Sequence, residues 1–356
     1  MKLRIAVLPG DGIGGEVIEQ ATRVCEAIAN KYNHQITWVK ALTGASAIDA
    51  VGEPYPDQTH QICVDSDAVM FGAIGDPKYD NDPSAKIRPE QGLLKMRQKL
   101  GLYANIRPTF VFPSLMDRSP LKRERIENTD LVFVRELTSG IYFGKRGRLD
   151  NGKTAFDTCT YKKFEIQRIA KKGFELAASR KKKLCCVDKA NVLESSRLWR
   201  ETLQEMETDY PEISVSYEFV DAVAMRLIQW PSDYDVLITE NLFGDILTDE
   251  ASVISGSMGL MPSASVGDKV SLYEPIHGSY PQAAGKNIAN PLATILSAAM
   301  MFEMSFNLNQ EASHIREVVN QSIESGYVTE DLAETPKHKS YSTTDVGDYL
   351  VQQILT

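Results

Sequence analysis

The sequence predicts an α/β fold, in which helices flank an open, mostly parallel sheet. Short apolar runs alternate with longer amphipathic segments along all 356 residues, as expected when helices cover a parallel sheet. An apolar fraction of 43% and a charged fraction of 24% are ordinary for a globular protein with a sizeable core. The length alone favours roughly two domains.

The elements follow from the spacing of apolar residues. The apolar runs expected to be buried strands are Ile5–Leu8, Ala68–Phe71, Leu131–Val134, Lys183–Val187 and Asp235–Ile238, with a further candidate at Ile36–Ala41. The segments with helical spacing are Glu16–Ala29, Gly92–Leu100, Phe164–Ser179, Ser195–Thr208 and Asn290–Phe306.

The segment Gly140–Tyr161 differs from this pattern. Aromatic and Thr residues surround Asn151 and Gly152, a dipeptide typical of a hairpin turn. An exposed arm of this kind is either a solvated flap or a dimer clasp, and the residues alone favour neither.

Charge and cysteine content limit the partners. A formal charge of −9 argues against broad contact with nucleic acid or anionic lipid, and five cysteines, an odd number, favour a reducing compartment. The first apolar stretch breaks at Pro9, too early for a signal peptide, and the run Leu292–Phe302 is too short to cross a bilayer. We therefore expect a cytoplasmic protein without nucleic-acid or membrane partners.

The glycine-rich segment Gly10–Gly15 matches the pattern G-x-G-x-x-G after a strand. A Rossmann-type dinucleotide site also needs an acidic residue at the end of the next strand, and the segment that follows Ile36–Ala41 has none there. A tight strand-to-helix turn that requires small residues is the favoured interpretation.

Three aspartates are candidate metal ligands. Asp245 and Asp249 would share one face of a helix that begins near Gly244, and two like charges at this spacing are unfavourable without a cation. Asp221 interrupts an apolar stretch, where an unpaired acid is costly. Hard oxygen ligands suit Mg²⁺ or Mn²⁺, although an acidic pair on a helix is also common on solvated faces.

Several basic residues could complete such a site. Lys189 ends a buried strand, where burial and a metal would lower its pKa and suit it to act as a base; a structural ion pair is the alternative. Arg97, Arg107 and Arg135 could bind a dicarboxylate through bidentate contacts if they converge on one cleft, and otherwise they are surface residues.

Long motifs occur in one order along essentially the whole chain. They are residues 8–14 (LPGDGIG), 105–108 (NIRP), 135–144 (RELTSGIYFG), 187–192 (VDKANV), 241–249 (NLFGDILTD) and 274–279 (EPIHGS). Together they resemble the metal-dependent β-decarboxylating dehydrogenases, the family of isopropylmalate and isocitrate dehydrogenases. The resemblance implies a two-domain fold, a cofactor site that is not a Rossmann sheet, and oxidation and decarboxylation of a small 2-hydroxy acid.

The resemblance also implies residue roles. Asp221, Asp245 and Asp249 would hold one Mg²⁺ or Mn²⁺, Lys189 would be the base, and Tyr142 would be the acid that reprotonates the product enol. The residues expected at the substrate are Arg97, Arg107, Arg135, Glu90, Leu93, Leu94 and Val192. Leu93 and Leu94 would form an apolar wall for an isopropyl group, although both could simply be core residues. A D-malate, tartrate or homoisocitrate dehydrogenase and a non-catalytic regulatory subunit are the competing hypotheses.

The implied cofactor is NAD. The residues expected to bind it are Ile74, Gly75, Asp76, Glu90, Glu274, His277, Gly278, Ser279, Gln282, Ala289, Asn290 and Asp331. NAD-linked members usually have Asp where this chain has Gln282, which leaves NADP as an alternative.

The resemblance further implies a homodimer with shared active sites. Lys189 and Asp221 would then serve the neighbouring subunit, and the arm 140–161 would be the clasp. Residues 1–102 and 257–356 are expected to form a large cofactor-binding domain. Residues 103–256 are expected to form a small dimerisation and substrate domain.

Overall fold

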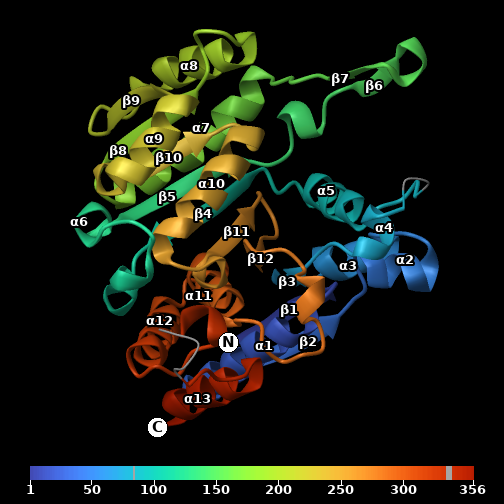
Figure 1. Cartoon of the computed structure of the whole chain (residues 1–356), viewed down its shortest axis with the longest axis vertical. Helices are drawn as coiled ribbons and strands as arrows, with labels where there is room; N and C mark the ends of the chain where they lie inside the picture. The colour runs from blue at the N-terminus through green and yellow to red at the C-terminus, as the bar shows by residue number, and fades with distance from the viewer. Residues whose placement is uncertain (83–84, 334–338) are drawn as a thin grey trace. The chain divides into compact units, whose positions relative to one another are not determined.

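The chain forms two compact units in the computed structural model, which describes residues 1–82, 85–333 and 339–356. Unit 1 comprises Met1–Leu102, Phe112–Arg118 and Gly256–Thr356. Unit 2 comprises Tyr103–Val111 and Ser119–Ser255. The prediction of an α/β fold with a mostly parallel sheet and flanking helices is confirmed (Figure 1).

The strands of unit 1 are arranged in the order β2-β1-β3-β12-β11. Their bounds are β1 (Lys2–Gly10), β2 (Gln35–Lys40), β3 (Ala68–Ala73), β11 (Pro262–Val266) and β12 (Leu272–Pro275). Neighbours are parallel except β11 and β12, and Ile5 of β1 is paired with Trp38 on one side and Ala68 on the other. The carboxyl ends of β1 and β3 therefore lie side by side, where a loop site can form.

Unit 1 contains two groups of helices. One contains α1 (Gly14–Lys31), α11 (Leu292–Phe306), α12 (Asn309–Glu324) and α13 (Thr343–Leu355). The other contains α2 (Ala45–Val51), α3 (Asp57–Val64), α4 (Pro77–Asp80) and α5 (Pro89–Leu100). Leu8 and Phe71 from the strands share a buried cluster with Met96 of α5, so α5 is anchored in the core.

The strands of unit 2 follow the order β4-β5-β10-β8-β9. Their bounds are β4 (Ala104–Phe110), β5 (Asp130–Glu136), β8 (Lys183–Asp188), β9 (Ser214–Phe219) and β10 (Val236–Thr239). Only β4 is antiparallel to its neighbour. The helices are α6 (Arg123–Ile126), α7 (Lys163–Ser179), α8 (Glu194–Glu207), α9 (Val220–Gln229) and α10 (Asn241–Ser255), with α7 packed on α8 and α9 on α10.

Every strand and helix predicted from apolar spacing is present. The predicted strands correspond to β1, β2, β3, β5, β8 and β10, and the predicted helices to α1, α5, α7, α8 and α11. The expected start of the Asp245 helix near Gly244 is wrong by three residues, because the backbone N–H of Gly244 already donates to the carbonyl of Glu240 (3.0 Å). Sequence spacing missed the strands β4, β9, β11 and β12 and the helices α2, α3, α4, α6, α9, α12 and α13.

The predicted hairpin is also confirmed. Strands β6 (Arg146–Leu149) and β7 (Thr154–Asp157) are antiparallel and project from the body of unit 2 (Figure 1). The turn contains Asn151 and Gly152 with φ of 53° and 87°, the left-handed region that these residues tolerate. Whether the arm clasps a partner stays a prediction.

The glycine-rich segment after β1 forms a packed turn. A Cβ on Gly12 would lie 2.0 Å from the carbonyl oxygen of Ser279, and one on Gly14 would lie 2.2 Å from that of Pro9. The N–H of Ile13 donates to the same Ser279 carbonyl (2.9 Å). Small residues are therefore needed here because two loops of unit 1 meet at backbone distance, as the tight-turn interpretation predicted.

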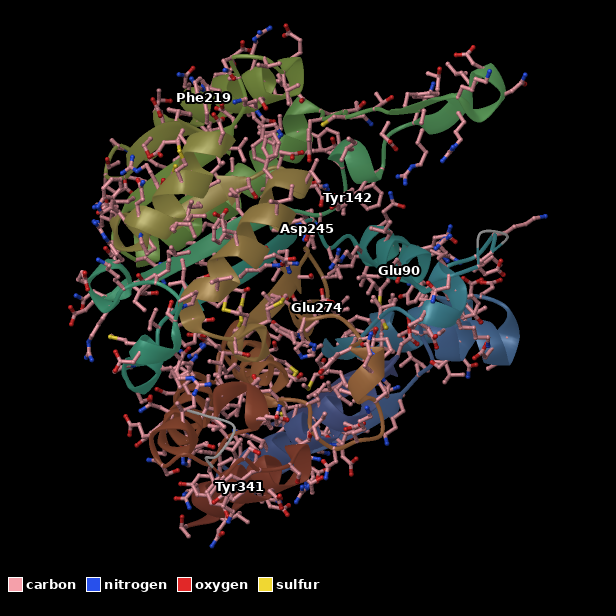
Figure 2. All side chains as sticks on the ribbon, in the orientation of Figure 1. Glu90, Tyr142, Phe219, Asp245, Glu274 and Tyr341 are labelled. Carbon is pink, nitrogen blue, oxygen red and sulfur yellow. The ribbon has the colours of Figure 1, made fainter. Side chains whose placement is uncertain are left out.

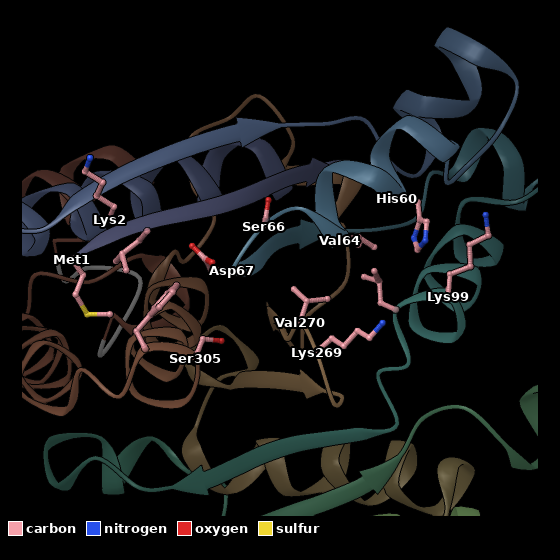
Figure 3. Close-up of a pocket in the computed structure, with 13 residues that line it drawn as sticks. Met1, Lys2, His60, Val64, Ser66, Asp67, Lys99, Lys269, Val270 and Ser305 are labelled. Atoms are coloured by element: carbon pink, nitrogen blue, oxygen red, sulfur yellow. The ribbon is translucent and has the colours of Figure 1, made fainter.

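No helix in the described part of the chain is both long and apolar enough to cross a membrane. Unit 1 contains a cavity of about 620 Å³ near the start of β1, with Leu3, His60, Lys99 and Lys269 among its lining residues (Figure 3). None of the residues that line this cavity is a predicted site residue.

Candidate active site

Helix α10 of unit 2 carries the aspartate pair. Asp245 and Asp249 are one turn apart, and the guanidinium of Arg107 reaches both, with Nη1 3.9 Å from Asp245 Oδ1 and 3.8 Å from Asp249 Oδ1. Arg135 contacts Asp245 more closely, at 2.5 Å from Nη1 to Oδ1. Two arginines thus offset the repulsion that the spacing of the aspartates predicts.

Antiparallel strands β4 and β5 place the two arginines. Asn105 of β4 pairs in register with Arg135 of β5, and Arg107 follows two residues later on the same strand. The Nε of Arg107 donates to Asn105 Oδ1 and its Nη1 donates to Thr248 Oγ1 of α10 (2.6 Å). The guanidinium is therefore held in place by both the strand and the helix before any ligand binds.

Tyr142 lies against the same aspartate. It ends a short 3₁₀ turn after β5, and its hydroxyl donates to Asp245 Oδ2 (2.7 Å) (Figure 2). Burial and the Asp245 carboxylate raise the pKa of Tyr142 to about 12, so the phenol keeps its proton near neutral pH. A protonated phenol beside the Arg135 guanidinium can donate a proton to an anionic ligand.

Lys189 and Asp221 form a separate pair in unit 2. Lys189 follows β8, Asp221 is in the first turn of α9, and their side chains form an ion pair. Hydrogen bonding from Lys189 lowers the pKa of Asp221. The Lys189 ammonium also lies 5.6 Å from the centre of the Phe219 ring. The ion pair that the sequence left open is therefore present.

The described side chains of one chain supply only some of the oxygen ligands that a Mg²⁺ or Mn²⁺ site requires. Among the described residues, no group of three or more His, Cys, Asp or Glu side chains is placed to hold a metal ion. Burial is the main cause of the raised pKa of Asp249, and the neighbouring Asp245 adds to it, so a cation would stabilise its charged form. Asp245 and Asp249 could thus supply two ligands of a Mg²⁺ or Mn²⁺ site.

Unit 1 contains the third predicted arginine. Arg97 of α5 is buried, and its Nη2 lies 3.1 Å from Oε1 of Glu274, which also accepts from the Ser265 hydroxyl (3.2 Å). The Nε of Arg97 is buried without a hydrogen-bond partner in the described part of the chain. Leu93 of the same helix packs on the core cluster, together with Ile74, and is partly buried.

Other predicted site residues of unit 1 also meet. A Cβ on Gly75 would lie 3.0 Å from Glu90 Oε1 and 3.4 Å from Ser279 Oγ, so these three residues line one small space. Asp76 caps α4 by accepting from the N–H of Lys78 (2.9 Å). In unit 2, Val192 is 61% exposed and lies beyond the end of β8.

A cavity of about 690 Å³ in unit 1 gathers five of the residues predicted to bind the cofactor. The predicted residues that line it are His277, Gly278, Ala289, Asn290 and Asp331. Asp331 accepts from Ser257 Oγ (2.6 Å), Asn290 Nδ2 (3.0 Å) and Thr329 Oγ1 (2.6 Å), so it ties three loops together. Gln282 is exposed and is not among the residues that line this cavity.

Comparison with known proteins assigns the family. Residues 4–350 match the family described as isocitrate/isopropylmalate dehydrogenase. The chain belongs to this family. A 3-isopropylmalate dehydrogenase of Bacteroides fragilis is 53% identical over 354 residues, covering 99% of both chains. The enzyme of the same name from Bacillus subtilis is 49% identical over 345 residues, covering 96% of this chain and 94% of that protein.

Solved structures of the isocitrate/isopropylmalate dehydrogenase family have the same fold. The isocitrate dehydrogenase of Methylococcus capsulatus has a TM-score of 0.88 at 32% identity and covers 99% of this chain and 100% of its own. A β-decarboxylating dehydrogenase of Thermococcus kodakarensis has a TM-score of 0.81 at 33% identity, covering 99% and 96%. The predicted family resemblance is confirmed.

Several polar residues in or beside the family motifs were not predicted as site residues. Asn105 and Thr248 hold Arg107, Asn241 accepts from Arg135, and Tyr161 donates to Glu240. Asn105 could have been found, because it stands two residues from Arg107 on one strand and shares its face. Tyr161 gave no such signal, since it is 80 residues from Asn241, to whose N–H it is bonded.

Proposed function

We propose that this chain is a 3-isopropylmalate dehydrogenase, which oxidises (2R,3S)-3-isopropylmalate with NAD and releases CO₂ to give 2-oxo-4-methylpentanoate in leucine biosynthesis. The geometric observation that carries the proposal is Arg107 and Arg135 facing Asp245, Asp249 and Tyr142 in unit 2. Cations that bind carboxylates, acids that bind a divalent ion and a protonated phenol are the groups that this reaction requires.

The proposed roles follow from the side chains. Arg107 and Arg135 bind the malate carboxylates, and Arg97 is the third arginine that the family resemblance assigns to the substrate. Asp245 and Asp249, with Asp221 from a neighbouring subunit, hold Mg²⁺ or Mn²⁺, which when bound polarises the substrate hydroxyl. Lys189 accepts the hydroxyl proton, also across the dimer, and Tyr142 donates a proton to the enol carbon after CO₂ leaves.

The remaining contacts set specificity. Leu93 and Leu94 of α5 offer apolar contacts for the isopropyl group, whose burial is worth about 2 kcal/mol. Glu90, Val192 and Glu274 complete the proposed substrate and nicotinamide contacts. The cavity at His277 and Asp331 takes the adenosine end of the cofactor. NAD is preferred to NADP. Gln282 is uncharged, so it opposes binding of the 2′-phosphate of NADP less than the usual aspartate would.

Initial rates across related acids test the proposal. Purified enzyme with NAD and Mg²⁺ or Mn²⁺ should turn over 3-isopropylmalate faster than D-malate, tartrate or homoisocitrate, and NAD should be preferred to NADP. Activity confined to an unbranched or tricarboxylic acid would replace the proposed substrate. A chain inactive on all of them in every metal and cofactor combination would point to a non-catalytic subunit.

A further inference from the structure

Two buried polar residues of unit 2, Tyr161 and Glu240, form a pair at the start of α10. Each is only 7% exposed, and the Tyr161 hydroxyl donates to Glu240 Oε2 (3.1 Å). The other carboxylate oxygen, Oε1, accepts from the N–H of Phe243 (2.8 Å). The Tyr161 oxygen also accepts from the N–H of Asn241 (2.9 Å). The pair thus binds two N–H groups of the first turn of α10 that have no partner within the helix.

Asn241, the first residue of α10, connects this pair to Arg135, one of the proposed substrate-binding arginines. Asn241 is almost fully buried, and its backbone carbonyl accepts from Arg135 Nε (2.9 Å) while its Oδ1 accepts from Arg135 Nη2 (2.9 Å). Its Nδ2 donates to the carbonyl of Ser139 (3.2 Å). Moving the start of α10 would therefore move two of the acceptors that orient the Arg135 guanidinium.

Close packing makes this connection stiff. A Cβ on Gly140 would lie 2.2 Å from the Tyr161 hydroxyl, and one on Gly244 would lie 2.6 Å from Arg135 Cγ. The backbone on both sides therefore touches the network directly. Arg135 in turn contacts Asp245, which accepts from Tyr142, so the contacts run without a gap from Tyr161 to the proposed acid.

Stability alone does not explain this arrangement. Glu240 is a buried carboxylate whose pKa is raised by burial, and the hydrogen bonds from Phe243 and Tyr161 and the charge of Arg135 oppose this shift only in part. A buried acid is costly, whereas Ser, Asp or Asn are the usual caps at lower cost. Its longer side chain reaches both the helix N–H of Phe243 and the Tyr161 hydroxyl, which lies 79 residues away in sequence.

We infer that Tyr161 and Glu240 are positioning residues, which fix the start of α10 and thereby hold Arg135 and Asp245 in register for substrate and metal. Neither residue is proposed to contact the substrate. The inference rests on the proposed function for the identity of that substrate. Loss of the Tyr161 hydroxyl should impair binding of the hydroxy acid and of the metal, and leave cofactor binding in unit 1 unchanged.

Tyr161→Phe tests this inference, with Tyr234→Phe as its matched control. Tyr234 is also buried in unit 2 and its hydroxyl also donates to a glutamate, Glu218 (2.9 Å), but in the described part of the chain its hydroxyl is not bonded to Arg135 or α10. We expect Tyr161→Phe to raise the KM for 3-isopropylmalate about tenfold, since a hydrogen bond to a charged group is lost, with the KM for NAD changed less than about twofold. Tyr234→Phe should change neither.

Mn²⁺ binding gives a readout besides activity. Titration of free Mn²⁺ followed by electron paramagnetic resonance, with 3-isopropylmalate present, should show weaker binding to Tyr161→Phe by about threefold or more, and no change for Tyr234→Phe. Thermal unfolding of each variant shows whether weaker binding comes from loss of the folded structure or from displacement of Arg135 and Asp245. Glu240→Gln keeps an acceptor for the N–H of Phe243. It should therefore raise the KM for 3-isopropylmalate and weaken Mn²⁺ binding by smaller factors than Tyr161→Phe does.

The outcomes separate the two proposals. Wild-type enzyme that does not act on 3-isopropylmalate would overturn the proposed function, while the Mn²⁺ titration without that acid would still compare the two tyrosine variants. An active wild type in which Tyr161→Phe matches Tyr234→Phe in both KM and Mn²⁺ affinity would overturn the positioning role. Equal increases in both KM values would also overturn it, because they would indicate a general loss of structure.

Discussion

The two units use different kinds of polar contact at their predicted sites. In unit 2 the site is a cluster of opposite charges, in which Arg107, Arg135, Asp245 and Asp249 bind one another. In unit 1 the cavity at His277 is lined largely by loops and held by hydrogen bonds to one acid. The first arrangement suits a small charged ligand, and the second suits a larger ligand with an uncharged face.

The largest effect should come from the charge cluster. Asp245→Asn keeps the size of the side chain but removes a proposed metal ligand and the charge that Arg135 faces, so kcat should fall by about 10³-fold or more. Steady-state rates with NAD and Mn²⁺ measure this. Asp209→Asn, an exposed aspartate of the same unit, should have ordinary activity. A wild-type turnover number in Asp245→Asn would contradict the assignment of the catalytic site to unit 2.

Lys189→Ala should come next. Loss of the proposed base should lower kcat by about 10² to 10³-fold, while unfolding by heat changes little, because the Asp221 side chain is 63% exposed and such a solvated ion pair is weakly stabilising. Lys171→Ala removes an exposed lysine of α7 and serves as the control. An unchanged turnover number for Lys189→Ala would end its assignment as the base.

A smaller and more selective effect is expected in unit 1. Asp331→Asn weakens the contacts to Ser257, Asn290 and Thr329, so the KM for NAD should rise about fivefold while the KM for 3-isopropylmalate stays within about twofold. A raised KM for 3-isopropylmalate with an unchanged KM for NAD would contradict the assignment of cofactor binding to unit 1. Steady-state titration of each substrate at saturation of the other makes the comparison.

The smallest expected effect concerns pH. Burial lowers the pKa of His277, so between this value and about 6.5 the unfolded chain binds a proton that the folded protein does not. Stability should therefore fall as the pH drops below about 6.5, and this decline in Tm should be shallower in His277→Gln. Parallel Tm curves for the two proteins would show that His277 does not contribute.

Sequence reasoning found what local patterns encode. Apolar runs such as Ile5–Leu8 predicted the buried strands, and the spacing of Asp245 and Asp249 predicted a shared helical face. It missed β9, whose polar and apolar residues alternate, because an edge strand has no continuous apolar run. It also missed the Tyr161–Glu240 pair, since two isolated polar residues far apart in the sequence become partners only through the tertiary fold.

Gly140 and Gly244 limit which substitutions this chain can accept, because neither position has space for a side chain. Even a methyl group at position 244 would press on Arg135 and on Thr239 Oγ1, at 2.6 and 2.3 Å, and Gly140 additionally has a φ of +78°. In a library randomised at both codons, active clones should therefore return glycine alone at each. Redesign of the proposed substrate preference would therefore begin with other positions, such as the proposed apolar contacts on α5.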